Sequence, residues 1–263
     1  MHLSERQSGI LQRARTLGRV EVEALAAEYD VSTRTIRRDL NELSRGGLLA
    51  RHHGGARPAT QVVNLAYAER RDLAAQAKRA IGVAAAALVP DGCSVILNIG
   101  TTTEEVARAL VDRRDLVVIT NNLHVVGILS GTPAKEIILA GGLVRQSDGA
   151  IVGDEAVSFI RGFKADFAFI GASALDEDGA VLDYDMREVA VARAIIANAR
   201  RAILVSDRQK FDRSAPMRIC DVGDLHAFVT DAPPPRGFAF ACEQAGVVVE
   251  VACASGQAQE AAQ

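Results

Sequence analysis

Apolar side chains in the first quarter of the chain recur every three or four residues, which is the period of an amphipathic helix. The pattern predicts helices over residues 4–17, 22–29 and 32–45, followed by a short hairpin over residues 48–55. Ser4 and Gln7 have the spacing of a capping box at the start of the first helix, and Ser32 is placed to cap the third. Three helices and a hairpin predict a winged helix-turn-helix domain over residues 1–57.

After this domain, short apolar runs alternate with amphipathic stretches. Residues 58–64 are interpreted as a linker, and residues 65–253 as a second domain that begins with a long helix over residues 66–88. Seven strands are then predicted, over residues 94–98, 116–120, 136–140, 166–170, 202–206, 227–230 and 247–251. Five further helices are predicted, over residues 104–110, 123–129, 155–161, 187–199 and 238–245. This alternation is typical of a mainly parallel sheet with helices on both faces, so the fold class is α/β. The Ala-rich end, residues 254–263, is expected to be a disordered tail.

Charge is distributed unevenly between the two predicted domains. The 263-residue chain has a formal net charge of −3, yet residues 1–58 carry +3 and the remaining residues −6. A basic first segment on an acidic body indicates an anionic partner for the first domain alone. Because 49% of the residues are hydrophobic, both domains can form a core.

The remaining composition argues against several other classes of protein. The four cysteines are far apart and form no metal-binding or disulfide pattern, so buried thiols are expected, and neither a metal nor a cofactor. The apolar runs are all shorter than the roughly 18 residues of a membrane-spanning helix, and the first residues do not resemble a signal peptide. We therefore expect a cytoplasmic protein with no membrane partner.

The second and third helices have the spacing of a helix-turn-helix. If Ile36 and Leu40 face inward, then Arg34, Arg38 and Asn41 lie on another face of the third helix. Arginine can bind guanine in the major groove, and hydroxyl groups can bind base edges or phosphates. The candidate contacts to double-stranded DNA are Ser32, Thr33, Arg34, Thr35, Arg37 and Arg38 in the helix, and Arg51, His52 and His53 in the hairpin.

The alternative interpretation of this segment is a solvated arginine-rich helix. The helix-turn-helix spacing, the Ser-Thr-Arg-Thr start and the basic, glycine-rich hairpin together favour DNA binding. Asp39 and Glu42 are not expected to contact bases, and Asp39 is expected to orient an arginine or stabilise the helix.

Four loops follow predicted strands and carry polar or glycine-rich sequence. Their candidate residues are Gly100, Thr101, Thr102 and Thr103; Thr120 and Asn121; Gly141, Gly142 and Arg145; and Asp207 and Lys210. The carboxyl ends of parallel strands share one edge of the sheet, where ligands bind. Glycine, threonine hydroxyls and helix-start amides suit a phosphate, although threonine runs also cap helices without any ligand. For Arg145 three roles remain as alternatives: it binds the ligand, it is a solvated charge in the loop, or it contacts another subunit of an oligomer.

Two long motifs carry a resemblance to a known family. Residues 31–40 read Val-Ser-Thr-Arg-Thr-Ile-Arg-Arg-Asp-Leu, and residues 47–56 read Gly-Leu-Leu-Ala-Arg-His-His-Gly-Gly-Ala. Both resemble the signature of the DeoR family of bacterial repressors, and the resemblance continues to about Pro235. It implies a repressor that leaves its operator DNA when a phosphorylated sugar or polyol binds, with a second domain similar to the sugar-phosphate isomerase fold.

The resemblance also assigns roles within the second domain. It implies phosphate contacts from Thr101, Thr102, Thr103 and Lys210, and effector hydroxyl contacts from Asn98, Asp207 and Glu188. Two positions depart from the family pattern: Asn98 stands where aspartate is common, and Gln209 precedes the Lys-Phe pair in place of the usual serine. Because of the first departure, the resemblance defines the role of Asn98 less closely than the roles of the other site residues.

Shorter blocks of sequence, such as residues 121–123, 148–153 and 183–189, are similar to the branch of the family that responds to glycerol 3-phosphate. Because several of these blocks are peripheral to a pocket, another sugar phosphate remains an alternative effector.

Two other classes of protein compete with a repressor. One is an isomerase that uses Asp207 and Glu188 as acid and base, and the other is an architectural DNA-binding protein. No enzymatic activity is expected. A homo-oligomer, dimer or tetramer, is expected because one recognition helix reads too few base pairs.

Overall fold

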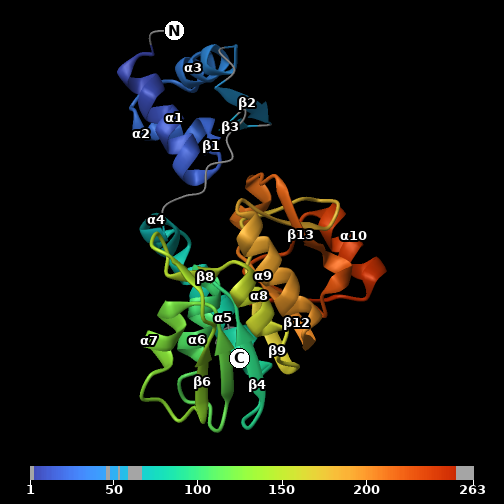
Figure 1. Ribbon diagram of the computed structural model, residues 1–263. Helices are drawn as coiled ribbons and strands as arrows, with labels where there is room; N and C mark the ends of the chain where they lie inside the picture. Colours follow the sequence, from blue (N-terminus) through green and yellow to red (C-terminus); the bar gives the residue numbers. More distant parts are fainter. Residues whose placement is uncertain (1–2, 46–47, 53, 59–66, 253–263) are drawn as a thin grey trace, which may run out of the picture. The chain divides into compact units, whose positions relative to one another are not determined.

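The computed structural model describes residues 3–45, 48–52, 54–58 and 67–252. The chain divides into two compact units, residues 1–65 with 212–214, and residues 66–211 with 215–263 (Figure 1). Pro58, which the sequence analysis placed in the linker, is the last residue of a strand. The rest of the predicted linker and the predicted tail lie outside the described residues, so their conformation stays a prediction.

The first unit contains three helices and a small antiparallel sheet. The elements are α1 (Glu5–Leu17), β1 (Val20–Glu21), α2 (Val22–Glu28), α3 (Thr33–Arg45), β2 (Leu49–His52) and β3 (Gly55–Pro58). The predicted capping box is confirmed, because the Ser4 hydroxyl accepts from the Gln7 amide at 3.1 Å and the Ser4 amide donates to the Gln7 side chain at 3.0 Å. The sheet order is β1-β3-β2. The sequence missed β1, which has only two residues and no detectable period.

The core of the first unit explains the orientation of α3. Ile36, Leu40 and Leu43 are fully buried and pack with the apolar faces of α1 and α2. Because these three residues occupy one side of the helix, the arginines between them face outward. The predicted inward stripe of the third helix is therefore confirmed.

The second unit contains a seven-stranded sheet with the order β15-β14-β12-β9-β4-β5-β6. Every neighbouring pair is parallel. The strands are β4 (Ser94–Leu97), β5 (Val117–Thr120), β6 (Glu136–Leu139), β9 (Ala165–Ile170), β12 (Ala199–Val205), β14 (Ala227–Thr230) and β15 (Val248–Val251). All seven predicted strands are confirmed, and so is the mainly parallel sheet.

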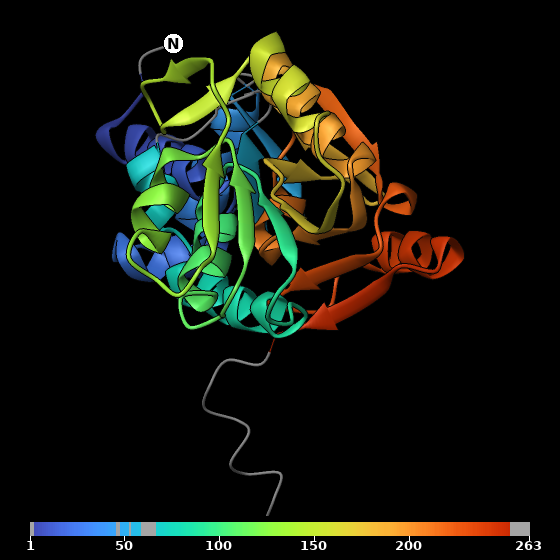
Figure 2. The same ribbon diagram turned by 60° about the horizontal axis from the view of Figure 1, so that its bottom comes forward.

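Helices cover both faces of this sheet, as Figure 2 shows from a second direction. The helices are α5 (Ala75–Ala87), α6 (Thr101–Ala109), α7 (Leu123–Leu129), α8 (Asp154–Ile160), α9 (Met186–Ala197) and α10 (Arg236–Ala245). Along β4, Val95 and Leu97 pack with α5, α6 and α7, whereas Ile96 packs with α8, α9 and α10. The alternation of side chains along a strand thus builds one core on each face.

The predicted helix over residues 66–88 is wrong as a single element. The structure has a short helix, α4 (Tyr67–Asp72), and then α5, with Ala74 between them in the left-handed region at φ 54°. The two helices have different surroundings, since α4 has no buried residue whereas α5 buries five. Helical period continues across the break, so the sequence pattern could not reveal it.

Short antiparallel strands complete the second unit. The strands β7 (Leu143–Arg145) and β8 (Ala150–Val152) form a hairpin, and β10 (Ala174–Leu175), β11 (Ala180–Asp183) and β13 (Met217–Asp221) form a small sheet. An isolated bridge between Asn122 and Ala150 joins the hairpin to the carboxyl end of β5. The sequence analysis predicted none of these strands, because they are too short to show a clear period of two.

The cysteines that the structure describes agree with the expectation of buried thiols in two cases. Cys220 and Cys242 are buried, and burial raises the pKa of Cys220 to about 12 and that of Cys242 to about 11. Cys93 is partly exposed, and Cys253 lies outside the described residues. Within the described ranges, no three His, Cys, Asp or Glu side chains are arranged so that they could hold a metal ion. None of the described helices is both long and apolar enough to cross a bilayer.

Candidate DNA interface and effector site

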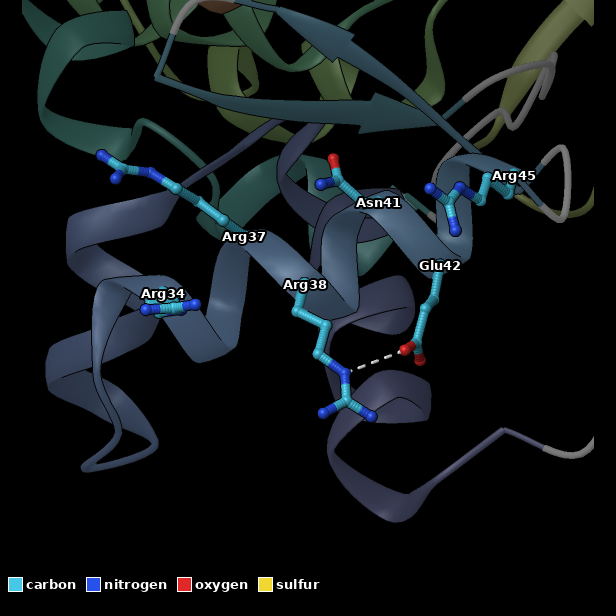
Figure 3. Close-up of a pocket in the computed structure, with 6 residues that line it drawn as sticks. All are labelled: Arg34, Arg37, Arg38, Asn41, Glu42 and Arg45. Carbon is cyan, nitrogen blue, oxygen red and sulfur yellow. Dashed lines mark hydrogen bonds and ion pairs between the residues drawn. The ribbon is translucent and has the colours of Figure 1, made fainter.

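The outward face of α3 is a basic surface. Arg34, Arg37, Arg38, Asn41, Glu42 and Arg45 line an open hollow along this helix (Figure 3). Arg34, Arg38 and Asn41 have the spacing that the sequence analysis expected, and all three side chains are exposed. Arg45 continues the same spacing by one more turn and was missed, although its position in the sequence could have shown it. This face presents four guanidinium groups and one amide, which suits the electronegative edges of bases and phosphates.

The amino end of α3 is held by two hydroxyl side chains. The Ser32 hydroxyl accepts from the Thr35 amide at 3.2 Å, and the two hydroxyl oxygens lie 2.9 Å apart. This confirms Ser32 as the cap of the helix. Ser32 and Thr33 are both exposed, so they remain accessible to a phosphate at the positive end of the helix dipole.

The two carboxylates of α3 have structural partners. Asp39 is buried and accepts from Nε of Arg6 in α1 at 2.7 Å, so the expectation that it pairs with an arginine is confirmed. Glu42 accepts from Arg38 at 3.1 Å and from Gln7 at 2.6 Å, and these two bonds lower its pKa. Neither carboxylate therefore opposes DNA as an unpaired negative charge.

The hairpin β2–β3 carries the remaining candidate DNA contacts. Arg51 is exposed, and His52 is partly buried. His53 lies outside the described residues. The exposed Arg51 side chain sits on a strand that has only β3 as its neighbour, as expected for a wing residue.

In the second unit, the candidate effector residues gather at the carboxyl edge of the sheet. Asn98 directly follows β4, Asn121 directly follows β5, and Asp207 lies two residues after β12. All three are buried, with 3%, 0% and 2% of their surface exposed. The side-chain oxygens of Asn98 and Asn121 are buried without a hydrogen-bond partner among the described residues. Buried acceptors of this kind are suited to the hydroxyl group of a ligand.

The threonine run forms the first turn of α6, three residues before the helix start predicted from the sequence. Gly100 precedes it with φ 131°, a conformation that L side chains rarely adopt. The Thr103 hydroxyl donates to the carbonyls of Asn98 and Gly100, at 2.8 and 2.7 Å, so its single hydrogen is used within the protein. Thr101 donates to the carbonyl of Arg70 over a longer 3.4 Å. Amides of the first turn have no intrahelical acceptors, which leaves them as donors for an anion.

The second candidate loop has a bracing role in the structure. The Thr120 hydroxyl donates to the carbonyl of Leu97 at 2.6 Å and accepts from the Asn122 amide at 3.0 Å. The Asn121 side chain donates to the carbonyl of Ile151 at 3.0 Å. These bonds tie the end of β5 to β4 and to the β7–β8 hairpin. Thr120 therefore holds this loop in place. Asn121 also holds the loop in place, and in addition carries the buried side-chain oxygen that has no partner among the described residues.

Arg145 is the centre of a buried ion-pair cluster, which excludes its interpretation as a solvated loop charge. Its guanidinium contacts Asp148 at 2.6 and 2.8 Å, Asp185 at 2.9 Å and Glu188 at 2.7 Å. Only 15% of its side chain is exposed. Arg70 joins the cluster through Asp148 at 3.0 Å. The sequence analysis did not assign Arg70 or Asp148 to the site, since neither belongs to one of the four candidate loop motifs, and the contact between them spans 78 residues.

The carboxylates of this cluster titrate differently. Burial, followed by the charge of Asp183, raises the pKa of Glu188 to about 8. The hydrogen bond from Arg187 and further contacts lower the pKa of Asp185 to about 2. Burial opposes ionisation of Asp148, but the bonds from Arg145 prevail and lower its pKa. Glu188 thus keeps its proton to a higher pH than Asp148 and Asp185 do, although all three carboxylates accept from Arg145.

The last two candidate loops lie at the same edge. Gly141 and Gly142 are exposed where β6 leads into β7, and Gly142 has φ 132°. Asp207 accepts from the Gln209 amide at 3.1 Å. Its carbonyl accepts from the Lys210 amide at 3.1 Å. Lys210 is partly buried within a 3-10 helix that begins at Arg208. A single turn therefore carries both the candidate hydroxyl contact and the candidate phosphate contact.

Comparisons with known proteins match both units. Residues 6–62 match the DeoR-like helix-turn-helix domain, and residues 73–232 match the DeoR C terminal sensor domain. The chain is 40% identical over 235 residues to the glycerol-3-phosphate regulon repressor of Escherichia coli K12, covering 89% of this chain and 93% of that protein. It is 41% identical over 218 residues to the HTH-type transcriptional repressor CsqR of the same organism, covering 83% and 84%.

Among solved structures, ribose 5-phosphate isomerase A of Methanocaldococcus jannaschii is similar over 52% of this chain and 54% of that protein. The sequence identity is 16% and the TM-score is 0.39. A likeness at this level says nothing about what the chain binds.

Proposed function

The chain belongs to the DeoR family of transcriptional regulators, and from that premise we propose that it is a repressor released from operator DNA by glycerol 3-phosphate. The observation that carries the proposal is the pairing of two surfaces in one chain. The first is the outward face of α3, with Arg34, Arg38, Asn41 and Arg45. The second is the carboxyl edge of the parallel sheet, where Gly100 leads into the threonine turn of α6.

The DNA half of the proposal rests on the geometry of α3. Its apolar stripe is fully buried, so the helix can enter the major groove only with its arginine face. Arg34, Arg37 and Arg38 are proposed to contact bases, with Thr33 and Thr35 at the positive helix end. Arg51 on the wing is proposed to contact phosphate, which positions the domain without reading sequence.

The effector half rests on the kinds of donor and acceptor at the sheet edge. The first-turn amides of α6, the hydroxyl of Thr102 and the ammonium of Lys210 suit a phosphate dianion. The side chains of Asn98, Asp207 and Glu188 suit the hydroxyl groups of a short polyol. An effector with a phosphate at one end and hydroxyls at the other would use both sets of groups.

The choice of glycerol 3-phosphate depends on similarity rather than on geometry. The relative named for that regulon is 40% identical to the chain, but CsqR is 41% identical, and its name specifies no effector. A different sugar phosphate is therefore the alternative to be tested. A sugar-phosphate isomerase is not proposed, since a likeness of fold is no warrant for chemistry, and its two candidate carboxylates have structural partners.

We further propose that the repressor acts as a homo-oligomer, a dimer or a tetramer, on an inverted repeat. One α3 helix spans only a few base pairs, whereas two related helices can read half-sites separated by about one helical turn or a multiple of it. Light scattering of the full chain, free and bound to its operator, tests this directly. A monomer that binds its site one-to-one contradicts the proposal.

The function is tested by measuring operator affinity in the presence of candidate effectors. The operator is first selected by the protein from a random-sequence library, and binding is followed by fluorescence anisotropy. Glycerol 3-phosphate should weaken binding about 5- to 150-fold per site, in line with typical coupling free energies, whereas glycerol should have no effect. If only a hexose phosphate releases the protein from DNA, the proposed effector is wrong and the proposed role as a repressor stands. Turnover of a sugar phosphate would favour the enzyme.

A further inference from the structure

The helix α4 is attached to the effector edge almost entirely by polar contacts. It is the first described element after residues 59–66, and none of its residues is buried. The Tyr67 hydroxyl donates to Glu104 of α6 at 2.8 Å. The Tyr67 ring stacks on His124 of α7 with 4.7 Å between the ring centres. Arg70 donates to Asp148, and its carbonyl accepts from Thr101 and from Lys78 of α5. A helix held in this way has an orientation that depends on the charges at the site.

Arg70 has an unused hydrogen-bond donor inside the protein. Its Nη2 donates to Asp148 at 3.0 Å, and 15% of its side chain is exposed. Its Nε is buried and has no hydrogen-bond partner within the part of the chain that the structure describes. A buried guanidinium N–H without an acceptor is unfavourable, because the group has lost water and gained nothing in return. This donor therefore lacks an acceptor that the described residues could supply.

The backbone of Arg70 places this donor beside the first turn of α6. The carbonyl of Arg70 accepts from the Thr101 hydroxyl at 3.4 Å. It also accepts from the ammonium of Lys78, whose side chain is buried in α5. Asn98, which is 3% exposed and has an unpartnered side-chain oxygen, lies two residues before Gly100. The backbone of Arg70 thus contacts the threonine turn, and the buried Asn98 amide lies just before that turn in the chain.

We propose that Arg70 is an effector-binding residue and donates from Nε to a phosphate oxygen of the ligand beside Thr101 and Thr102. Arginine suits this role because its planar guanidinium offers several donors in a fixed geometry. The bond to Asp148 does not prevent it, since Arg145 holds both oxygens of that carboxylate through two bonds of its own. Arg70 can therefore turn toward a phosphate without leaving Asp148 unpaired. The proposal rests on the proposed phosphorylated effector.

Arg70 differs from the other candidate ligands in where it lies along the chain. The threonine turn, Asp207 and Lys210 follow strands of the parallel sheet, whereas Arg70 belongs to the helix that directly follows residues 59–66. A phosphate bound by Arg70 exchanges a contact of α4 with the protein for a contact of α4 with the ligand. Effector binding is then linked to the position of the first helix of the sensor unit.

The proposal is tested by titration calorimetry of the full chain with glycerol 3-phosphate and, separately, with inorganic phosphate. Arg70→Met should weaken binding of both probes about 10- to 100-fold, the loss typical for one charged hydrogen bond. Arg71→Met is the matched control, because this neighbouring arginine has 57% of its side chain exposed and pairs only with Asp72 in the described residues. The control should bind both probes like the unmodified protein, and both variants should keep operator affinity without effector.

A second variant separates ligand binding from a purely structural role of Arg70. Asp148→Asn removes the carboxylate that competes with phosphate for the Arg70 guanidinium. If Arg70 binds the ligand, Asp148→Asn should bind glycerol 3-phosphate as tightly as the unmodified protein or more tightly, opposite to Arg70→Met. If Arg70 serves only to hold Asp148, both substitutions should weaken binding equally, and the proposal is wrong. Arg70→Lys, which keeps the charge but lacks Nε, replaces Arg70→Met if that variant does not fold.

The results also separate this inference from the proposed function. Unchanged binding of glycerol 3-phosphate by Arg70→Met overturns the role of Arg70 and leaves the proposed effector intact. Binding of inorganic phosphate alone, lost in Arg70→Met, overturns the proposed effector and supports the role of Arg70. Binding of neither probe by the unmodified protein overturns both.

Discussion

Nε of Arg6 in α1 lies 2.7 Å from Oδ2 of Asp39 in α3, and only 6% of the Asp39 side chain is exposed. The pair joins the first helix to the helix that carries the arginine face. Gln7 adds bonds from α1 to Asp39 and Glu42. The position of the side chains that we propose to contact DNA thus depends on a residue that is not itself among them.

Asp39→Asn should destabilise the first unit without altering its outer surface. Removing a charged hydrogen bond from a buried position costs about 1–3 kcal/mol. Amides of α3 should exchange faster with deuterium, and operator affinity should fall on all sequences alike. Asp30→Asn, in the exposed turn before α3, is the matched control. Unchanged exchange in α3 would mean that the apolar core alone fixes the helix.

Arg37→Ala and Arg51→Ala should weaken DNA binding in different ways. If Arg37 reads a base, its loss should cost about 1–3 kcal/mol on the operator and relax specificity at one position. Arg51 on the wing should contribute equally to every sequence, and its loss should reduce the salt dependence of binding by about one unit of slope. Binding isotherms at several salt concentrations, on operator and on random DNA, distinguish the two. Equal losses of Arg37→Ala on both DNAs would make Arg37 a phosphate contact.

Glu188 should make the stability of the sensor unit fall as pH rises. Its pKa in the folded protein is about 8, raised by burial from an ordinary 4.5. The folded state therefore holds a proton that the unfolded state has lost, so the stabilisation is complete below pH 4.5 and disappears as pH rises to 8. The slope in this window should be at most about 1.4 kcal/mol per pH unit.

Urea unfolding at several pH values between 4.5 and 8 measures this slope. Glu188→Gln should flatten it, because glutamine stays neutral at every pH. Glu155→Gln, an exposed position on α8, should leave the slope unchanged. A slope that persists in Glu188→Gln would place the titrating group elsewhere.

The elements that the sequence predicted are those set by local periodicity. All seven core strands and the arginine face of α3 follow from alternations that a few consecutive residues contain. The strand ends in turn locate Asn98, Asn121 and Asp207 at one edge, because parallel strands end together. The sheet, and the edge at which these three side chains lie, were therefore predictable.

The contacts within the site were not predictable, because they join distant segments. Arg145 and Glu188 are 43 residues apart, and Arg70 and Asp148 are 78 apart. Whether a threonine hydroxyl faces a ligand or its own backbone likewise depends on where the helix begins. Because α6 begins at Thr101, the Thr103 hydroxyl donates to the backbone carbonyl of Asn98, and the sequence, which predicted a later helix start, did not indicate this bond.

Lys210 is predicted to be a charge that the effector needs in order to release the repressor. The first-turn amides of α6 and the hydroxyl of Thr102 can orient a phosphate, but they carry no formal charge to offset its two negative charges. A lysine ammonium supplies that charge. Lys210→Ala should therefore bind operator normally and yet resist glycerol 3-phosphate. Thr102→Val should show the same defect more mildly, because it removes one hydroxyl and leaves the amides in place.

The measurement is an operator-binding titration with increasing glycerol 3-phosphate. The concentration that gives half release should rise about tenfold or more for Lys210→Ala, since a hydrogen bond to a charged group contributes about 1.5–3 kcal/mol. Lys135→Ala is the matched control, because Lys135 is exposed immediately before β6, at the opposite edge of the sheet. If Lys210→Ala responds at the same concentration as the unmodified protein, the phosphate does not lie against Lys210. The turn that starts at Asp207 would then contact the polyol end of the effector alone.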